Sequence, residues 1–376
     1  MPPEGPVSRL DVQAQGYAPW RPRGESVEGR TGIGQILFPS DNQLVVTYIS
    51  QARTETFPRR SQAEASSNLQ LEALFVDPNL GRLRARRQWP TFSDKARIGP
   101  ASGGKFVVVT PDDLTLYSPE IQALRKLDLD VGREAIPGEW NASASPGGKY
   151  LLISYSPRSN EGGWMGDAIT EFELIDTELL RITRSWTDKG FGGIHPFYCL
   201  DDGEIVAING TGGATVIGPP GGPWRVFQAP WPPRCAPHLK KTPVTDDAIF
   251  GGTTLSIDRW CYSLTLTTGE VVFAQQFADK ETVRWLAASG GGRRFAIAVY
   301  RGRGGSWALD IGAHYSLNRV MVYDIPGHRW IFTLSGKNQG IKSISGLALS
   351  PQGSLLALIN QDGILEVYRI PERSGN

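Results

Sequence analysis

Short apolar runs alternate with turn residues along most of the chain, and residues 348–371, ALSPQGSLLALINQDGILEVYRIP, show the pattern clearly. Apolar segments at 345–349, 355–359 and 364–370 are separated by turns that contain Gly, Ser, Asp and Asn. Runs this short are typical of strands, and glycine supplies the positive φ that tight hairpin turns require. The pattern predicts three antiparallel strands, and the middle run, which is apolar without alternation, is expected to be covered on both faces.

The same pattern recurs through the sequence. A turn containing glycine precedes an apolar run in GPASGGKFVVV from residue 99, SASPGGKYLLISYS from residue 143, LDDGEIVAING from residue 200 and SGGGRRFAIAVY from residue 289. A strand of shared form follows as LTLYS, FELID, VMVYD and LEVYR, from residues 114, 172, 320 and 365. The shorter spacings between units match the roughly 40 to 50 residues of a four-stranded propeller blade, and the longer ones belong to the first, third and sixth units, which carry insertions.

We therefore predict an all-β fold in which residues 1–376 form a single seven-bladed β-propeller. The blades are expected at about residues 34–90, 96–128, 139–186, 191–229, 232–278, 282–335 and 341–371. The last unit has only three strands, which would leave an exposed sheet edge. Within the N-terminal segment 1–33, residues 7–13 (VSRLDVQ) alternate well enough to form a strand. We predict that this strand completes the last blade and closes the ring.

At VMVYD and LEVYR, with the preceding GGGRRFAIAVY and SPQGSLLALIN, the chain resembles Trp-Asp-repeat propellers and related bacterial β-propellers. In that family a comparable segment ending in Asp forms the third strand of a blade, so the resemblance implies the same fold over nearly the whole chain. In these segments the family's Gly-His dipeptide and Trp-Asp pair are missing. Tyr117, Tyr323 and Tyr368 stand where the Trp would be, and only Asp176 and Asp324 supply the acid. The resemblance implies a fold and not a particular activity.

Charge and hydropathy limit the classes of partner. Thirty-nine basic residues against 38 acidic residues give a formal net charge of +1, so the bulk charge indicates neither nucleic acid nor an anionic membrane, although a local patch is compatible with it. No apolar run reaches the roughly 20 residues that cross a bilayer. The amino end has neither a basic start nor an apolar core segment, so we expect no export signal in the sequence as given, and the compartment stays open.

The motifs of catalysis and cofactor binding are weak. Residues 99–106, GPASGGKF, have the spacing of a phosphate-binding loop, but a strand follows where the mechanism needs a helix, so a hairpin turn is expected. Acidic pairs fall in predicted turns, where Asp side chains cap backbone amides. The four histidines show no metal-ligand spacing and are expected to be scattered: His195, His238, His314 and His328. No catalytic residue, cofactor or metal site is predicted.

The three cysteines, Cys199, Cys235 and Cys261, match no zinc pattern and are too few for a disulfide framework. Two alternatives remain open. The cysteines are isolated buried thiols, or Cys235 pairs with Cys261 in an oxidising compartment.

Three long polar insertions are the best guide to function. They occupy about residues 51–68, 156–169 and 301–318, each between the second and third strands of a blade, and should therefore crowd one face. Loops on a rigid scaffold commonly carry binding residues, and Trp and Arg are enriched at interface hot spots. The candidate ligand-binding residues are Arg158, Trp164, Arg301, Arg303, Trp307, His314 and Tyr315.

We predict a non-enzymatic binding or scaffold propeller that uses this face to hold a protein, a peptide or an anionic ligand. A protein or peptide partner is expected, with no nucleic acid and no membrane span. One alternative is a hydrolase or lactonase-like enzyme with acidic and His side chains gathered at the central channel. A second is glycan recognition by stacking of sugars on Trp164 or Trp307.

Overall fold

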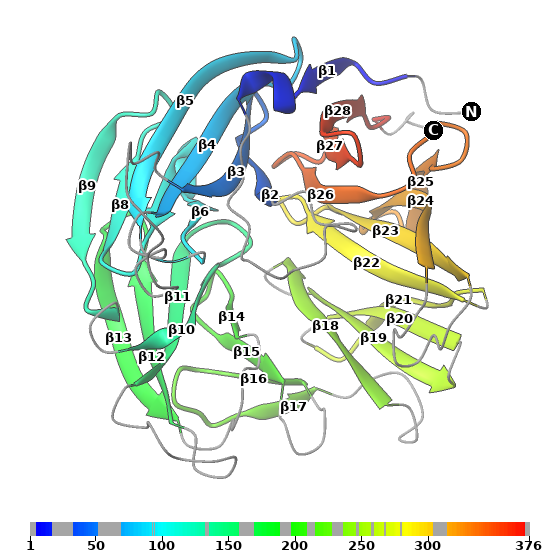
Figure 1. Ribbon diagram of the computed structural model, residues 1–376. Helices are drawn as coiled ribbons and strands as arrows, with labels where there is room; N and C mark the ends of the chain where they lie inside the picture. The colour runs from blue at the N-terminus through cyan, green and yellow to red at the C-terminus, as the bar shows by residue number, and fades with distance from the viewer. Residues whose placement is uncertain are drawn as a thin grey trace.

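The computed structural model describes residues 5–16, 33–51, 69–91, 93, 95–131, 135–157, 169–188, 197–208, 215–227, 236–245, 248–256, 259–266, 268–278, 280–303 and 314–372. Their strands form seven four-stranded antiparallel sheets arranged as the blades of a ring (Figure 1). The predicted all-β, seven-bladed propeller is confirmed. The described residues also hold two 3-10 turns, η1 (Gln13–Gln15) and η3 (Ser102–Gly104), and none of their helices is long and apolar enough to cross a membrane.

The four strands of a blade run from the ring's inner side to its outer side, and we label them a to d. Blade 1 comprises β2 (Ile33–Ser40), β3 (Gln43–Gln51), β4 (Leu69–Asp77) and β5 (Arg82–Thr91). Blade 2 comprises β6 (Arg97–Pro100), β7 (Phe106–Val109), β8 (Asp113–Tyr117) and β9 (Ala123–Asp128). Blade 3 comprises β10 (Ala135–Ala144), β11 (Tyr150–Pro157), β12 (Thr170–Asp176) and β13 (Arg181–Asp188). Blade 4 comprises β14 (Tyr198–Cys199), β15 (Ile205–Ile208), β16 (Thr215–Gly218) and β17 (Arg225–Phe227). Blade 5 comprises β18 (Ala236–Thr245), β19 (Ala248–Ser256), β20 (Arg259–Leu266) and β21 (Val271–Gln276). Blade 6 comprises β22 (Glu281–Ala288), β23 (Arg294–Arg303), β24 (His314–Asp324) and β25 (Arg329–Ser335). Blade 7 comprises β26 (Ile344–Leu349), β27 (Leu355–Asn360), β28 (Ile364–Arg369) and, as its outer strand, β1 (Ser8–Asp11).

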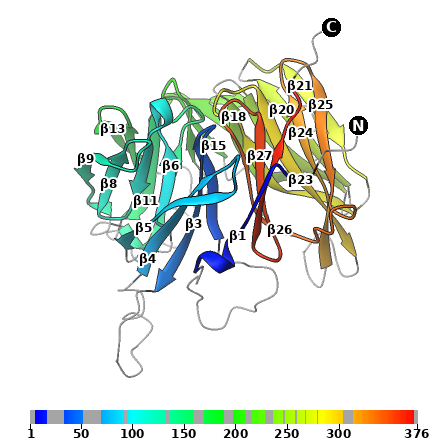
Figure 2. The same ribbon diagram turned by 90° about the horizontal axis from the view of Figure 1, so that it is seen from above.

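Because the strands are antiparallel, the connections between strands a and b leave from one side of the ring and those between strands b and c from the other. We call these the a–b side and the b–c side. In Figure 2 the ends of β3 and β4, and those of β23 and β24, lie on the lower side, which is the b–c side. The segments 52–68, 158–168 and 304–313 connect strands b and c of blades 1, 3 and 6, as predicted for the insertions.

A Ser-x-x-Gly motif shapes the recurring turn between strands a and b. The serine hydroxyl oxygens accept a backbone N–H from the start of strand b in three blades: Ser145 from Tyr150 at 3.0 Å, Ser289 from Arg294 at 3.1 Å and Ser350 from Leu355 at 3.2 Å. The glycines three residues later have φ of +74° at Gly148, +68° at Gly292 and +72° at Gly353. Only glycine adopts this backbone without strain, which explains why the sequence repeats it.

Each pair of neighbouring blades encloses its own hydrophobic cluster, so the core of the described chain is divided into seven parts. The tyrosines at the expected Trp positions belong to these interfaces. Tyr368 and Tyr323 are buried, and the ring of Tyr117 stacks on Phe106 at 5.2 Å between centroids. Aromatic side chains bury large areas, so these residues join adjacent blades as a Trp would.

The amino-terminal strand closes the ring as predicted. Strand β1 pairs with β28 from Ser8 opposite Val367 to Asp11 opposite Ile364. Val12 directly after it is fully buried in the cluster between blades 7 and 1. The Ser8 hydroxyl also donates to the carbonyl oxygen of Pro78 in blade 1. The strand therefore completes blade 7 and joins it to the first blade.

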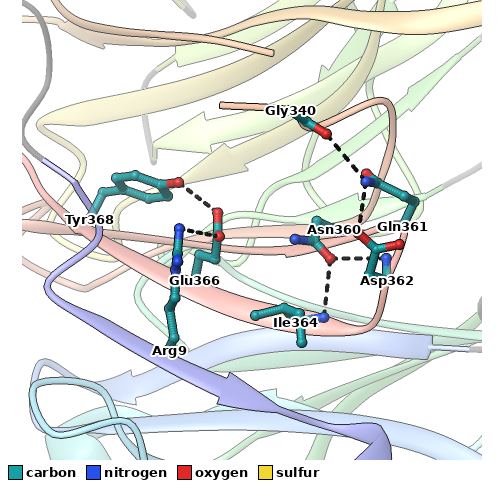
Figure 3. Close-up of polar contacts among 8 residues, drawn as sticks. All are labelled: Arg9, Gly340, Asn360, Gln361, Asp362, Ile364, Glu366 and Tyr368. Carbon is teal, nitrogen blue, oxygen red and sulfur yellow. Dashed lines mark hydrogen bonds and ion pairs between the residues drawn. The ribbon is translucent and has the colours of Figure 1, made fainter. Parts of the chain in front are cut away.

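Buried glutamates reinforce both sides of this closure. In blade 7 the Arg9 guanidinium lies 3.1 Å from the Glu366 carboxylate, which also accepts the Tyr368 hydroxyl at 2.6 Å (Figure 3). In blade 1 the Glu72 carboxylate accepts Arg86 Nε at 2.7 Å, and Arg86 also donates to the carbonyl oxygen of Gln15 at 3.3 Å. One ion pair thus ties the amino-terminal segment to blade 7, and a hydrogen bond from Arg86 ties it to blade 1.

We expect Glu72→Gln to lower the free energy of unfolding at neutral pH by about 1–3 kcal/mol, because Arg86 would lose its counterion and one accepting carboxylate oxygen would become an NH2 donor. Burial raises the pKa of Glu72, but hydrogen bonds from Ser50, Gln88 and Arg86, together with the Arg86 charge, bring it below its ordinary value of 4.5. A carboxyl with a lower pKa in the folded state contributes stability above its unfolded pKa and loses it as the pH falls through the folded value. Urea unfolding of Glu72→Gln should therefore show a weaker decline of stability below about pH 4.5 than wild type.

The exposed Glu178 provides the matched control. Glu178→Gln should change neither the free energy of unfolding at neutral pH nor its decline at low pH. An acid dependence of Glu72→Gln equal to that of wild type would contradict the ion-pair assignment.

Candidate binding surfaces

The structure places part of the predicted site. Arg158, Trp164 and Trp307 lie outside the described residues, and for Arg303 and His314 only the backbone is described, as a register pair that joins the ends of β23 and β24. Side chains are described for two of the seven residues. Arg301 is exposed and Tyr315 is half-buried.

Arg301 and Tyr315 lie on opposite faces of blade 6. Arg301 pairs in register with Glu281 and Ser316, whereas Tyr315 pairs with Gly302, the next residue. Successive residues of a strand point to opposite faces of the sheet. The structure therefore separates these two side chains, although their closeness in sequence suggested a shared site.

Tyr315 instead meets a cation that the sequence did not indicate. The Arg284 guanidinium, from the inner strand β22, lies 3.6 Å from the centroid of the Tyr315 ring and 5.9 Å from that of Tyr300. The Tyr300 hydroxyl accepts the backbone N–H of Ile344 in blade 7 at 2.8 Å, which fixes this ring at the interface of blades 6 and 7. Burial raises the pKa of Tyr300, so its hydroxyl remains protonated and can also donate. The Tyr300 ring beside the Arg284 guanidinium is therefore held in place by blade 7.

A second polar cluster anchors the other face of the same rim. Glu281, at the start of β22, is 3% exposed. Its carboxylate accepts the two terminal nitrogens of Arg319 at 2.7 and 3.0 Å, and the Asn318 amide also donates to it. This bidentate pair neutralises the buried carboxylate, so Glu281 adds no free negative charge to the rim.

Two cavities occupy the centre of the ring toward the a–b side. One, of about 580 Å³, is lined mainly by apolar side chains and by Gly and Pro residues of the a–b turns in blades 1, 2, 3, 6 and 7. The other, of about 310 Å³, is lined by residues of blades 1 to 4 and 6. A Cβ atom added to Gly290 in blade 6 would lie 3.6 Å from the carbonyl oxygen of Pro146 in blade 3, so these two turns meet across the centre.

Among the described residues, the ionisable side chains that line the two cavities are Asp41, Arg97 and Tyr198. The larger cavity is lined by Asp41, whose carboxylate accepts the backbone N–H of Gln352 at 3.2 Å. The smaller is lined by Arg97, which donates to the carbonyl oxygen of Ala142 at 2.8 Å, and by Tyr198. Burial raises the pKa of Tyr198 to about 12, so its hydroxyl stays protonated at neutral pH. The enzyme alternative predicts carboxylates and histidines gathered here, and of these the described lining residues include the carboxylate of Asp41.

The predicted structural role of turn carboxylates is evident at Asp201. Its oxygens accept the backbone N–H of Gly147 at 2.7 Å and that of Lys149 at 3.3 Å, both in the neighbouring blade. Cys199, two residues earlier, is buried, and burial raises the pKa of its thiol. Cys235 lies outside the described residues, but Cys261 is buried and forms no disulfide in the structure, which favours the alternative of isolated buried thiols over a pairing with Cys235. Within the described part of the chain, no three His, Cys, Asp or Glu residues gather closely enough to hold a metal ion.

The seven sheets thus define the class of this protein as a seven-bladed β-propeller. Neither a protein-family model nor a curated protein sequence matches the chain. Among solved structures it is similar to the β-propeller domain of Cps50 (Swd1) from Myceliophteria thermophila, with 13% identity over 74% of this chain and 96% of that chain and a TM-score of 0.37. It is also similar to the hydrazine synthase of Kuenenia stuttgartiensis, with 14% identity over 93% of this chain and 99% of that chain and a TM-score of 0.49. A third similar structure is the C-terminal WD40 domain of Sif2, with 11% identity over 91% of this chain and 96% of that chain and a TM-score of 0.45.

Proposed function

We propose that this propeller is a binding module whose b–c side holds an anionic segment of a protein partner at blade 6. The observation that carries the proposal is the Arg284 guanidinium, which stacks 3.6 Å from the centroid of the Tyr315 ring while Arg284 remains exposed. A guanidinium fixed against a ring keeps its plane and can present paired N–H groups to a carboxylate or a phosphate. Little conformational freedom is then lost when the partner binds.

The surrounding charge supports an anionic partner. We define the blade 6 rim as Lys280, Arg284, Tyr315 and Lys342, three of which are basic and exposed, while Arg301 lies on the opposite face of the blade. Lys342 belongs to this rim because its carbonyl oxygen accepts the backbone N–H of Leu317 on β24 at 2.6 Å. The nearby Glu281 carboxylate is buried and paired with Arg319. The rim therefore presents positive charge around the Arg284 stack, which favours encounter with negative groups.

The insertions extend the same proposal. Residues 304–313 connect the two strands that end at this rim, and residues 158–168 make the corresponding connection in blade 3. We assign Trp307, Trp164 and Arg158 to partner contacts from these segments. A hot spot that combines Trp with Arg would then be shared between two blades.

The test compares partner capture by wild type, Arg284→Ala with Tyr315→Ala, and Trp164→Ala with Trp307→Ala, using extract of the source cells and mass spectrometry. A protein held by wild type should be lost by both double variants, and a synthetic peptide of its acidic or phosphorylated segment should bind at least about tenfold more weakly to them in calorimetry. Arg329→Ala, at an exposed arginine of the outer strand β25, is the matched control and should retain the partner.

Thermal unfolding establishes that each variant is folded. If folded rim variants hold the same proteins as wild type, with unchanged peptide affinity, the assignment of function to this rim is wrong.

A further inference from the structure

The outer strands of blades 1 to 3 carry a concentration of positive charge that the near-zero net charge of the chain does not suggest. Strands β5, β9 and β13 hold eight basic residues and two acidic ones, Asp128 and Asp188. We define these eight as the outer wall: Arg82, Arg84, Arg86, Arg87, Arg125, Lys126, Arg181 and Arg184. All eight are exposed.

Three of the eight cations have a carboxylate partner. Arg84 pairs with Asp77, Arg86 with Glu72, and Lys126 with Asp113 and Asp128. The remaining five form no ion pair with any residue that the structure describes: Arg82, Arg87, Arg125, Arg181 and Arg184. Their charge is therefore available to an external ligand.

Protection of sheet edges does not account for this charge. Charged side chains on an outer strand do discourage pairing with another chain. However, the outer strand of blade 5, β21, has the sequence VVFAQQ without any charge, and β25 of blade 6 has the single cation Arg329. The outer edges of blades 5 and 6 thus carry little charge, so edge protection alone does not account for the eight cations of the outer wall.

The ring brings these strands together although they are distant in sequence. Figure 1 shows β5, β9 and β13 next to one another on the outer side of the ring. Arg125 on β9 donates to the carbonyl oxygen of Leu179, in the turn before β13, at 3.4 Å. Arg82 and Arg181 each begin an outer strand directly after such a turn. The unpaired cations therefore follow one continuous stretch of the perimeter.

Exposed apolar side chains occur on the same outer strands and in the turn whose carbonyl oxygen accepts Arg125. Leu124 on β9 is 48% exposed, Leu179 is 45% exposed and Ile182 on β13 is 40% exposed. Interfaces with nucleic acid are polar and strongly charged, whereas protein interfaces combine apolar contacts with Arg. We infer that the outer wall is a second docking surface, distinct from the blade 6 rim, which takes an acidic protein segment with apolar side chains between its carboxylates.

The probe is a fluorescein-labelled peptide of about twelve residues, composed of glutamates with two leucines, and its binding is followed by fluorescence anisotropy in about 50 mM NaCl. Arg125→Glu with Arg181→Glu should weaken binding at least tenfold, because two attractive charges become repulsive. The matched control, Arg293→Glu with Arg329→Glu, makes the same change in net charge at exposed positions of blade 6 and should leave binding nearly unchanged.

Two further measurements separate the acidic protein segment from other ligands. Leu124→Ser with Ile182→Ser should weaken peptide binding several-fold, and a single-stranded DNA of equal charge should bind more weakly than the peptide. DNA binding tighter than peptide binding, with no effect of the serine variants, would overturn the proposal in favour of phosphate recognition. Equal loss of affinity in the Arg293 and Arg329 control would overturn it in favour of non-specific charge attraction. Arg284→Ala should not change this affinity, so the outcome is independent of the function proposed for the rim.

Discussion

Deletion of residues 1–15 should lower the free energy of unfolding by about 5 kcal/mol or more, since it removes an entire outer strand and leaves a buried carboxylate without its cation. The deletion removes the β1–β28 ladder, flanked by Val7 N–H to Val367 carbonyl at 2.7 Å and Val12 N–H to Gly363 carbonyl at 3.1 Å. It also empties the position of Val12, which is fully buried between blades 7 and 1. Differential scanning calorimetry and urea unfolding measure the loss.

A deletion of residues 1–5 is the matched control, because Gly5 is exposed and β1 begins only at Ser8. It should melt as wild type does. A synthetic peptide of residues 5–16 added to the longer deletion should restore stability in proportion to its concentration, since a ligand that binds only the folded state stabilises it by mass action. Unchanged melting of the longer deletion, or no response to the peptide, would contradict closure of the ring by β1.

The fold could be predicted because its signals are local. Each Ser-x-x-Gly turn, such as Ser145 with Gly148, is a self-contained backbone arrangement that needs glycine at one position. The closing strand was predictable because a last blade with three strands leaves an unpaired sheet edge. The segment around Leu10, near the other end of the chain, has the alternating pattern of a strand that could pair with this edge. Periodicity and turn chemistry therefore determine the number of blades and how they close.

The binding surfaces depend on contacts between distant residues, and so the sequence revealed less of them. Arg284 lies at a register shift between Val283 and Trp285, about 30 residues before the Tyr315 that it stacks on, and no local motif marks it. Arg301 and Tyr315 appeared to share a site until strand register placed them on opposite faces. Only a three-dimensional arrangement shows which residue types converge.

The outer wall was hidden for a related reason. A net charge of +1 averages over the chain, whereas the ring collects cations from residues 82–87, 125–126 and 181–184 on one stretch of its perimeter. On these three outer strands basic residues outnumber acidic ones by eight to two, although the chain as a whole is nearly balanced. Net charge therefore says little about partners until the fold distributes it.

Tyr368→Ala should lower the free energy of unfolding by about 3–5 kcal/mol, the usual cost of deleting a large buried aromatic side chain. Tyr368 is 1% exposed and belongs to the cluster between blades 6 and 7, where its ring centroid lies 6.3 Å from that of Phe332. Its hydroxyl donates to Glu366 at 2.6 Å (Figure 3). Burial and the nearby Glu366 carboxylate raise the pKa of Tyr368, so the hydroxyl stays a donor across the neutral range. Urea unfolding measures the change.

Tyr368→Phe separates the two contributions, because it keeps the ring and removes the hydroxyl. We expect a loss of about 1–2 kcal/mol, because Glu366 would then keep Arg9 as an ion-pair partner but lose a hydrogen-bond donor. In the background of the 1–15 deletion, which also removes Arg9, the same substitution should cost more, since the buried carboxylate would have lost both partners. Strictly additive losses would mean that Arg9 and Tyr368 act on Glu366 independently. A nearly neutral Tyr368→Ala would mean that β28 does not present this ring to blade 6.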